Sequence, residues 1–134
     1  MKVLNLPIKK QWFDMIECRE KPEEYREIKR HWVLRLMEGR SRHPSLLFAF
    51  NHWRVYCGIE GAVIDRLLEN RIAKFKPYTH ILFRNGYSAK SPEMLVELKD
   101  ITVGRGNPKW GAPDKEVFIL HLGEIVERKN QNHD

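Results

Sequence analysis

A lysine, a glutamate and an arginine follow one another closely after the first amphipathic segment of the chain. Lys21 lies just upstream of Glu24 and Arg26. At positions i and i+2 of a strand, Glu24 and Arg26 would project from one face, where they can pair or share a ligand. The three groups could thus bind a base edge and a phosphate together. The alternative is a surface ion pair at a strand start, worth roughly 0–1 kcal/mol.

A second set of candidate residues lies in the glycine- and proline-rich segment 105–113. Its glycines would let the backbone approach a ligand. Arg105 and Lys109 would attract phosphate, and Trp110 would offer a face for base stacking. The alternative is a plain Gly/Pro loop with one aromatic side chain tucked onto the domain. Both interpretations stay open.

Two further segments carry basic side chains. The turn Arg84-Asn85-Gly86-Tyr87 contains the strongest short turn signal of the sequence, Asn-Gly, beside an arginine and an aromatic ring. We predict either a third ligand-binding loop from Arg84, Asn85 and Tyr87 or a hairpin turn with an exposed tyrosine. A basic run at Arg40, Arg42 and His43 is interpreted as a solvated loop that could extend an RNA-binding face.

Composition sets the broad class. The chain has 134 residues, enough for one domain with its own core, and 24 Lys+Arg against 18 Asp+Glu give a net charge of +6. A basic balance suits a polyanionic partner, although many small proteins share it. Two cysteines without CxxC spacing favour reduced thiols. With no signal peptide and no apolar run long enough to span a membrane, we expect a soluble, cytoplasmic protein without a membrane partner.

Motifs for metals and cofactors are missing from the sequence. The six histidines lack ligand spacing with each other or with the cysteines, so no metal site is expected. The sequence contains no GxGxxG, P-loop, GxSxG or HExxH pattern. We therefore expect neither a metal nor a cofactor.

Hydrophobic periodicity predicts the elements that position the candidate groups. A helix from about Pro7 to Arg19 would bury a stripe of Ile8, Trp12 and Ile16. The aromatic segment Leu46 to Cys57 is interpreted as one strand or a strand pair. Further helices are predicted at 31–38 and 62–74, and strands at 3–6, 23–28, 78–84, 94–103 and 117–122, with 125–128 as a continuation. This mixed order predicts an α+β fold with a small β-barrel or curled sheet and a solvated tail at 130–134.

The helix-turn-strand segment IECREKPEEYR resembles the signature of the ASCH domain family, approximately I-x-x-G-x-K-x-x-E-x-R. Ile16, Lys21, Glu24 and Arg26 match it in order and spacing. Arg19 stands where the family usually has glycine, so the helix exit must find another geometry or strain a non-glycine residue. Later segments that also resemble the family are 83–87, 96–106, 109–113 and 118–126. Residues 39–77 are poorly covered and are expected to form an insertion in a single ASCH/PUA-like domain of residues 1–134.

The resemblance implies a PUA-like fold, a small β-barrel with flanking helices, whose cleft is bordered by Lys21, Glu24 and Arg26. It also implies binding of RNA or a modified nucleotide. A related branch, the acetylcytidine amidohydrolases, uses a lysine, a threonine and a glutamate. Lys21 matches the lysine, but Glu24 stands at the threonine position, and a carboxylate cannot simply replace a hydroxyl nucleophile in amide hydrolysis. Some ASCH-like proteins are ribonucleases.

Three functions stay open at this level. The first is a binding module in which Lys21 and Arg26 meet phosphate, while Glu24 accepts from a base amino group or orients Arg26. The second is a hydrolase on nucleotide or RNA, with Glu24 as general base and Lys21 or Arg26 stabilising negative charge. The third is a protein-interaction domain that docks a partner on Leu46 to Cys57, which a large exposed apolar patch would favour. The ligand, any catalysis, the form of the insertion and the oligomeric state are left open.

Overall fold

The fold mixes α-helices and β-strands, as the sequence predicts. The computed structural model describes residues 1–40 and 45–130, so Arg42 and His43 of the basic run and residues 131–134 of the predicted tail lie outside the described residues. In chain order the elements are β1 (Val3–Pro7), α1 (Lys10–Glu17), β2 (Glu23–Arg26), α2 (Arg30–Leu36), β3 (Met37–Gly39), α3 (Leu46–Cys57), α4 (Glu60–Glu69), β4 (Ala73–Phe75), β5 (His80–Arg84), β6 (Glu93–Arg105), the 3-10 helix η1 (Pro108–Trp110) and β7 (Glu116–Lys129).

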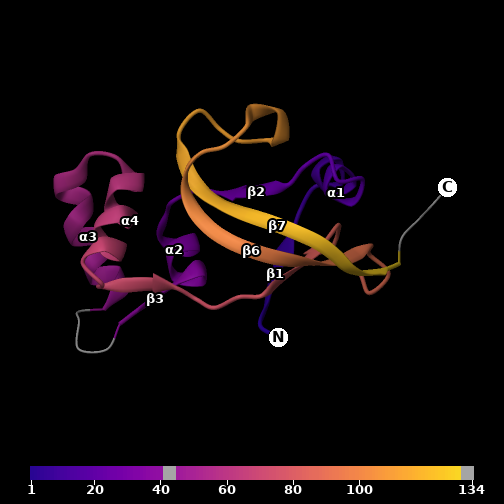
Figure 1. The fold of residues 1–134 in the computed structure, drawn as a ribbon, viewed down its shortest axis with the longest axis horizontal. Coiled ribbons are helices and arrows are strands. Elements are labelled where there is room, and N and C mark those ends of the chain that lie inside the picture. The colour runs from indigo at the N-terminus through magenta and orange to yellow at the C-terminus, as the bar shows by residue number, and fades with distance from the viewer. Residues whose placement is uncertain (41–44, 131–134) are drawn as a thin grey trace. The chain divides into compact units, whose positions relative to one another are not determined.

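Five of the strands form one curled sheet, a half-barrel with the strand order β1-β5-β6-β7-β2 (Figure 1). β1 runs parallel to β5, with Val3 opposite His80 and Pro7 opposite Arg84. β5 runs antiparallel to β6, so that Arg84 faces Glu93 across the pair. β3 and β4 form a separate antiparallel pair. The strand predicted at 94–103 is longer in the structure, because β6 continues through Gly104 to Arg105.

The chain divides into two compact units. Unit 1 comprises Met1–Glu24, Pro77–Ile101 and Leu120–Asp134, and unit 2 comprises Tyr25–Lys76 and Thr102–Ile119. β1, α1 and β5 lie in unit 1, whereas α2, α3, α4, η1 and the β3–β4 pair lie in unit 2. The predicted corner is therefore divided within β2, with Lys21 and Glu24 in unit 1 and Arg26 in unit 2.

Unit 1 has its core where α1 and the strands bring their apolar faces together. Alternation along the strands buries every second side chain, which is the period expected of a half-buried sheet. Its buried hydrophobic side chains are Leu4, Leu6, Phe13, Ile16, Ile81, Phe83, Met94, Val96, Leu98, Ile101, Leu120 and Leu122. The predicted helix start at Pro7 is wrong: Pro7 pairs with β5 and the Ile8 amide donates to the Arg84 carbonyl at 2.9 Å, which keeps this segment extended.

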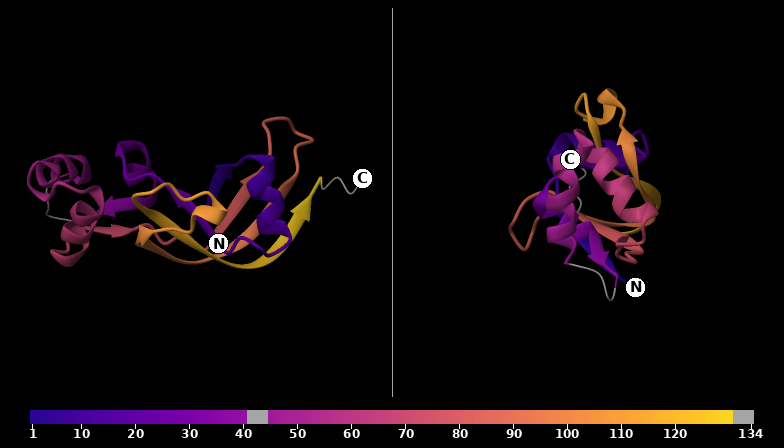
Figure 2. Two further views of the ribbon diagram at one scale, coloured as in Figure 1. Left: turned by 90° about the horizontal axis from the view of Figure 1, so that it is seen from above. Right: turned by 90° about the vertical axis from the view of Figure 1, so that its left-hand side faces the viewer.

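Unit 2 contains a helical hairpin in which α3 and α4 lie side by side (Figure 2). The prediction of strand structure for Leu46 to Cys57 is wrong. Ser45 caps α3 by accepting a hydrogen bond from the Phe48 amide at 3.2 Å, and Leu46, Ala49 and Phe50 are buried at helical spacing. Aromatic content favoured a strand, but the cap and the spacing determine a helix. The predicted helix 62–74 ends early, because residues 73–75 form β4.

Candidate functional site

The exit of α1 sets the geometry of the predicted corner. Arg19 has φ 71°, in the left-handed region, where a non-glycine residue costs roughly 1–2 kcal/mol. The amides of Glu20 and Lys21 both donate to the carbonyl of Met15, at 2.9 and 3.0 Å. The chain therefore turns sharply off the helix with the strain carried at Arg19. Of the two alternatives expected where the motif's glycine is missing, another exit geometry or a strained residue, the structure has the strained residue.

Lys21 and Glu24 form an ion pair inside unit 1. The Lys21 Nζ lies 3.3 Å from the Glu24 Oε1, and their side chains are 0% and 9% exposed. The same Nζ lies 5.3 Å from the centre of the Trp12 ring, which adds a cation–π contact. Trp12 was predicted only as a core residue of the helix. The lysine amine is thus enclosed between a carboxylate and an indole, where it holds the carboxylate in place.

Burial of this pair has an energetic consequence. Desolvating two charges is expensive, and a well-packed apolar pair of similar size is often as stable or more stable. Both side chains are almost entirely enclosed, so this pair differs from the solvent-exposed ion pairs that contribute little to stability. Stability alone therefore does not account for a lysine and a glutamate at these two positions.

Two contacts hold the start of β2 against the strand β7 within unit 1. The Leu122 amide donates to the carbonyl of Pro22 at 3.0 Å. The ring Nδ1 of His121 lies 3.6 Å from the Glu23 Oε2. These contacts lie immediately before Glu24 on the chain, and Glu24 itself belongs to β2, so its backbone is part of the strand rather than of a free loop.

The next residues of β2 belong to unit 2, where Arg26 stacks on an indole ring. The Arg26 guanidinium lies 4.8 Å from the centre of Trp32, and that of Arg35 lies 5.3 Å from the same ring. Two planar cations therefore share one half-buried aromatic side chain. Trp32 and Arg35 were not predicted as site residues, because at helical spacing they are typical of an ordinary surface helix.

The loop 105–113 is built around Tyr25. The Tyr25 hydroxyl accepts a hydrogen bond from the Asn107 amide at 3.0 Å, and a side chain at Gly106 would collide with the Tyr25 ring. Trp110 packs, half-buried, against a cluster of Tyr25, Ala112, Val117 and Ile119. The alternative of an aromatic tucked onto the domain therefore describes Trp110 well.

The cations of this loop remain at the surface. Arg105 is exposed and pairs with Asp114 at the other end of the loop. Lys109 is exposed, and its amide donates to the Asn107 Oδ1 at 2.9 Å at the start of η1. The structure thus brings Arg105, Lys109 and Trp110 into one loop of unit 2.

The turn after β5 resembles an ordinary hairpin connection. The Arg84 Nη2 donates to the Glu93 Oε1 at 2.6 Å, and the Asn85 amide donates to the Pro92 carbonyl at 3.0 Å. Tyr87 is exposed, as the hairpin alternative predicts. Arg84 and Tyr87 nevertheless line one pocket of about 310 Å³ in unit 1. These two candidates therefore lie together.

The helix α3 presents aromatic side chains to solvent. Among the residues that the structure describes, eight large hydrophobic side chains are exposed, and four of these lie between residues 48 and 59. The rings of Phe48 and Tyr56 lie 6.4 and 5.2 Å from the ring of His52, centre to centre, which makes a continuous aromatic row. The helix α3 thus carries a row of exposed apolar side chains, a feature that favours the protein-interaction hypothesis.

Within residues 1–40 and 45–130, no three His, Cys, Asp or Glu side chains are grouped so as to hold a metal ion. Both cysteines are free thiols. None of the helices in the described part of the chain has the length and apolar character needed to cross a membrane.

Comparison with known proteins gives no match: no family model matches the chain, no curated protein matches its sequence, and no solved structure matches its fold. The resemblance to the ASCH family therefore rests on the matched residues of the sequence and stays a prediction.

Proposed function

We propose that this protein is an ASCH-type, PUA-like domain that binds RNA or a modified nucleotide at the corner between α1 and β2. The observation that carries the proposal is the buried Lys21–Glu24 ion pair. It lies at the two positions where the family motif has its lysine and glutamate. The free energy needed to desolvate the two charges is not evidently offset by a gain in the stability of the fold. A fixed carboxylate that recognises a ligand would explain why a buried lysine and glutamate occupy these positions.

Each motif residue takes a distinct role in this proposal. Lys21, whose side chain is fully enclosed, is a positioning residue that orients Glu24. Glu24 accepts a hydrogen bond from a base amino group. Arg26, half-buried against Trp32, meets a phosphate with its guanidinium fork, for which it is pre-oriented by the ring. The net charge of +6 adds general attraction for a polyanion.

The test is binding of single-stranded RNA as a function of salt. Wild type should bind less tightly as salt rises, and Arg26→Gln should reduce the slope of log K against log salt by about one phosphate contact. The variant Lys21→Met/Glu24→Leu removes both buried charges while keeping apolar volume, so it should fold and lose binding. Lys10→Gln, at an exposed lysine of α1, is the matched control and should bind as wild type does.

Two results would contradict the proposal: no RNA or modified-nucleoside binding by wild type, or equal binding by wild type and the Lys21→Met/Glu24→Leu variant. The same samples decide the hydrolase alternative. If bound RNA or nucleoside is cleaved, and Glu24→Gln keeps binding while turnover is lost, then Glu24 acts as the general base. An intact ligand after prolonged incubation identifies a binding module.

A second candidate function is self-association through α3. Its exposed side chains Phe48, Val55 and Tyr56 are 62%, 79% and 69% exposed, an apolar row suited to another apolar surface. Residues 45–71 contain three arginines and three acidic residues, so this hairpin is neutral in a chain of net charge +6. A neutral apolar face favours a second copy of the chain, in a two-fold dimer, over a nucleic acid.

Sedimentation velocity over a range of protein concentrations tests this second candidate. Wild type should form dimers, and Phe48→Ser/Tyr56→Ser should remain monomeric at every concentration. Val126→Ser, which changes an exposed hydrophobic residue of unit 1, is the control and should dimerise like wild type. A monomeric wild type, or dimers that the double variant still forms, would contradict self-association through α3.

A further inference from the structure

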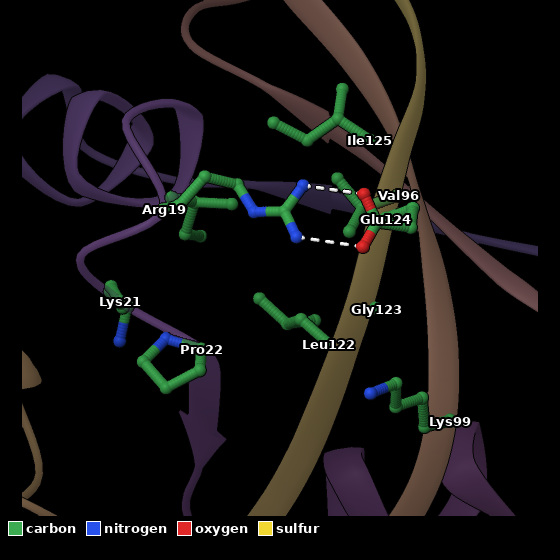
Figure 3. A pocket seen from close by; sticks show the side chains of 10 residues that line it. Arg19, Lys21, Pro22, Val96, Lys99, Leu122, Gly123, Glu124 and Ile125 are labelled. Atoms are coloured by element: carbon green, nitrogen blue, oxygen red, sulfur yellow. Dashed lines mark hydrogen bonds and ion pairs between the residues drawn. The ribbon is translucent and has the colours of Figure 1, made fainter.

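Unit 1 contains a pocket of about 230 Å³ beside the exit of α1 (Figure 3). Its apolar wall includes the buried side chains of Ile16, Val96 and Leu122. Four charged residues also line it: Arg19, Lys21, Lys99 and Glu124. We call this the Arg19 pocket. Its combination of an apolar wall and charged side chains at the opening is typical of a site for a small polar ligand.

Across this pocket Arg19 and Glu124 form a two-pronged ion pair. The Arg19 Nη1 and Nη2 donate to the two carboxylate oxygens of Glu124, at 2.8 and 2.9 Å (Figure 3). The hydrogen bonds and attraction of Arg19 hold the pKa of Glu124 below its ordinary value, and Lys99 adds attraction in the same direction. The carboxylate of Glu124 therefore occupies a place where two cations favour an anion.

The position of Lys99 depends on the glycine beside it. A side chain added at Gly123 would come within 3.3 Å of the Lys99 Cε and 3.0 Å of the Glu97 Cβ. Glycine at this point of β7 leaves room for the lysine stem to lie across the strand. In Figure 3 the Lys99 amine points toward the pocket from the side opposite Arg19.

Stability gives little reason for an arginine at position 19. Its left-handed backbone conformation is strained for a residue that has a side chain. An exposed ion pair contributes little to stability, and both partners here are more than half exposed. Strain that the local contacts do not offset is characteristic of functional positions. The arginine at position 19 therefore calls for an explanation other than stability.

We propose that the Arg19 pocket binds a phosphate monoester, which takes the place now held by the Glu124 carboxylate against Arg19, in a pocket that Lys99 also lines. A phosphate monoester carries about −1.5 to −2 charges and three acceptor oxygens, more than a carboxylate offers. The planar guanidinium of Arg19 fits two of those oxygens. Glu124 is exposed, so it can turn into water when displaced. The apolar wall then takes a sugar or base edge.

The inference rests on the proposed function, because a nucleotide is the phosphate-bearing ligand which that function supplies. The two sources of the phosphate are a free mononucleotide and the end of an RNA strand. Calorimetric titration with AMP against adenosine examines the first. Binding of 5′-phosphorylated against 5′-hydroxyl RNA of one sequence examines the second. We expect wild type to prefer the phosphorylated member of at least one pair by about tenfold.

Variants of the pocket identify where this preference arises. Glu124→Gln removes the competing carboxylate and should tighten binding of the phosphorylated ligand by about three- to tenfold. Arg19→Gly relieves the backbone strain and should abolish the preference for phosphate while leaving the fold intact. Asp14→Asn is the matched control for charge, since Asp14 is also an exposed carboxylate paired with a cation, and it should change binding little.

The outcomes separate this inference from the proposed function. If RNA binds in a salt-dependent manner but neither pair shows a preference for phosphate, the pocket proposal is wrong and the corner proposal stands. A preference that survives Arg19→Gly unchanged also contradicts it. If no ligand of either pair binds to wild type, both proposals fail together.

Discussion

The corner after α1 and the exposed face of α3 depart from ordinary protein architecture in opposite directions. At the corner two charged side chains, Lys21 and Glu24, are enclosed, whereas on α3 aromatic side chains such as Phe48 and Tyr56 are exposed. Buried charges and exposed apolar patches are the informative exceptions to the rule that apolar groups lie inside. Both features point to function, but they have different consequences for stability.

This difference predicts how mutations should behave. A buried charge is coupled to its partner, so that changing one member leaves the other unpaired in a medium of low dielectric constant. An exposed aromatic side chain makes few contacts within its own chain and can be replaced at little cost. Function at the corner is therefore difficult to separate from stability unless both charges are changed together. On α3, a mutation can change function without changing stability.

The largest effect is expected from Lys21→Ala. It leaves the Glu24 carboxylate buried without its cation, and the free energy of unfolding should fall by about 3–5 kcal/mol. Urea denaturation followed by circular dichroism measures this change. The double variant Lys21→Met/Glu24→Leu should recover most of the loss. A double variant as unstable as Lys21→Ala would show that the ion pair itself stabilises the fold.

Two phenylalanines of α3, one buried and one exposed, test whether exposed aromatic side chains contribute little to stability. Phe50 is 1% exposed and Phe48 is 62% exposed. Phe50→Ala should lower the free energy of unfolding by about 3 kcal/mol, through lost burial and the cavity that remains. Phe48→Ala should change it by less than about 0.5 kcal/mol. A large loss for Phe48→Ala in the monomer would mean that this ring is part of the core.

The strands of the sheet and the helix α3 show where the sequence was sufficient to predict secondary structure and where it was not. Alternation and turn signals predicted β1, β5, β6 and β7 within a few residues, because their burial follows the strand period directly. The helix α3 was predicted as a strand. Its aromatic composition favoured a strand, and its polar face, which would have indicated a helix, is itself occupied by Phe48 and Tyr56. The feature that makes α3 unusual is the one that obscured its period.

At the site, sequence spacing could identify charged residues but could not determine their environment. Nothing in the pattern from Lys21 to Arg26 indicates that the lysine is enclosed while Arg26 stacks on Trp32. The contribution of Trp12, Trp32 and Arg35 depends on tertiary contacts. Arg19 did give a signal: an arginine where the resembled motif has glycine left either another exit geometry or a strained residue, and Arg19 adopts φ 71°.

A smaller effect is expected at Tyr25, which is buried and polar at once. Tyr25→Phe keeps the ring against Gly106 but leaves the Asn107 amide without its hydroxyl acceptor. The free energy of unfolding should fall by about 1–2 kcal/mol. Hydrogen exchange at the Asn107 amide should accelerate in the variant by more than exchange at β6. Unchanged exchange at Asn107 would show that water replaces the hydroxyl without cost.

The smallest effect concerns the exposed ion pairs, which contrast with the enclosed pair of the corner. The hydrogen bond and attraction of Lys115 hold the pKa of Glu27 below its ordinary value of 4.5, with a lesser contribution from Lys29. Because the carboxyl pKa is lower in the folded state, its stabilisation is present above pH 4.5 and is lost as the pH falls through the folded-state value. Exposure and screening limit this contribution to a few tenths of a kcal/mol. Lys115→Gln should remove most of it, so that wild type and variant differ slightly in stability at pH 7 and converge once the pH has fallen through the folded-state pKa of Glu27. Salt at 1 M should abolish the difference, since exposed pairs are screened, while the loss caused by Lys21→Ala should persist. A loss at Lys21 that salt removes equally would mean that the corner pair is accessible to solvent, and the contrast between the two kinds of pair would not hold.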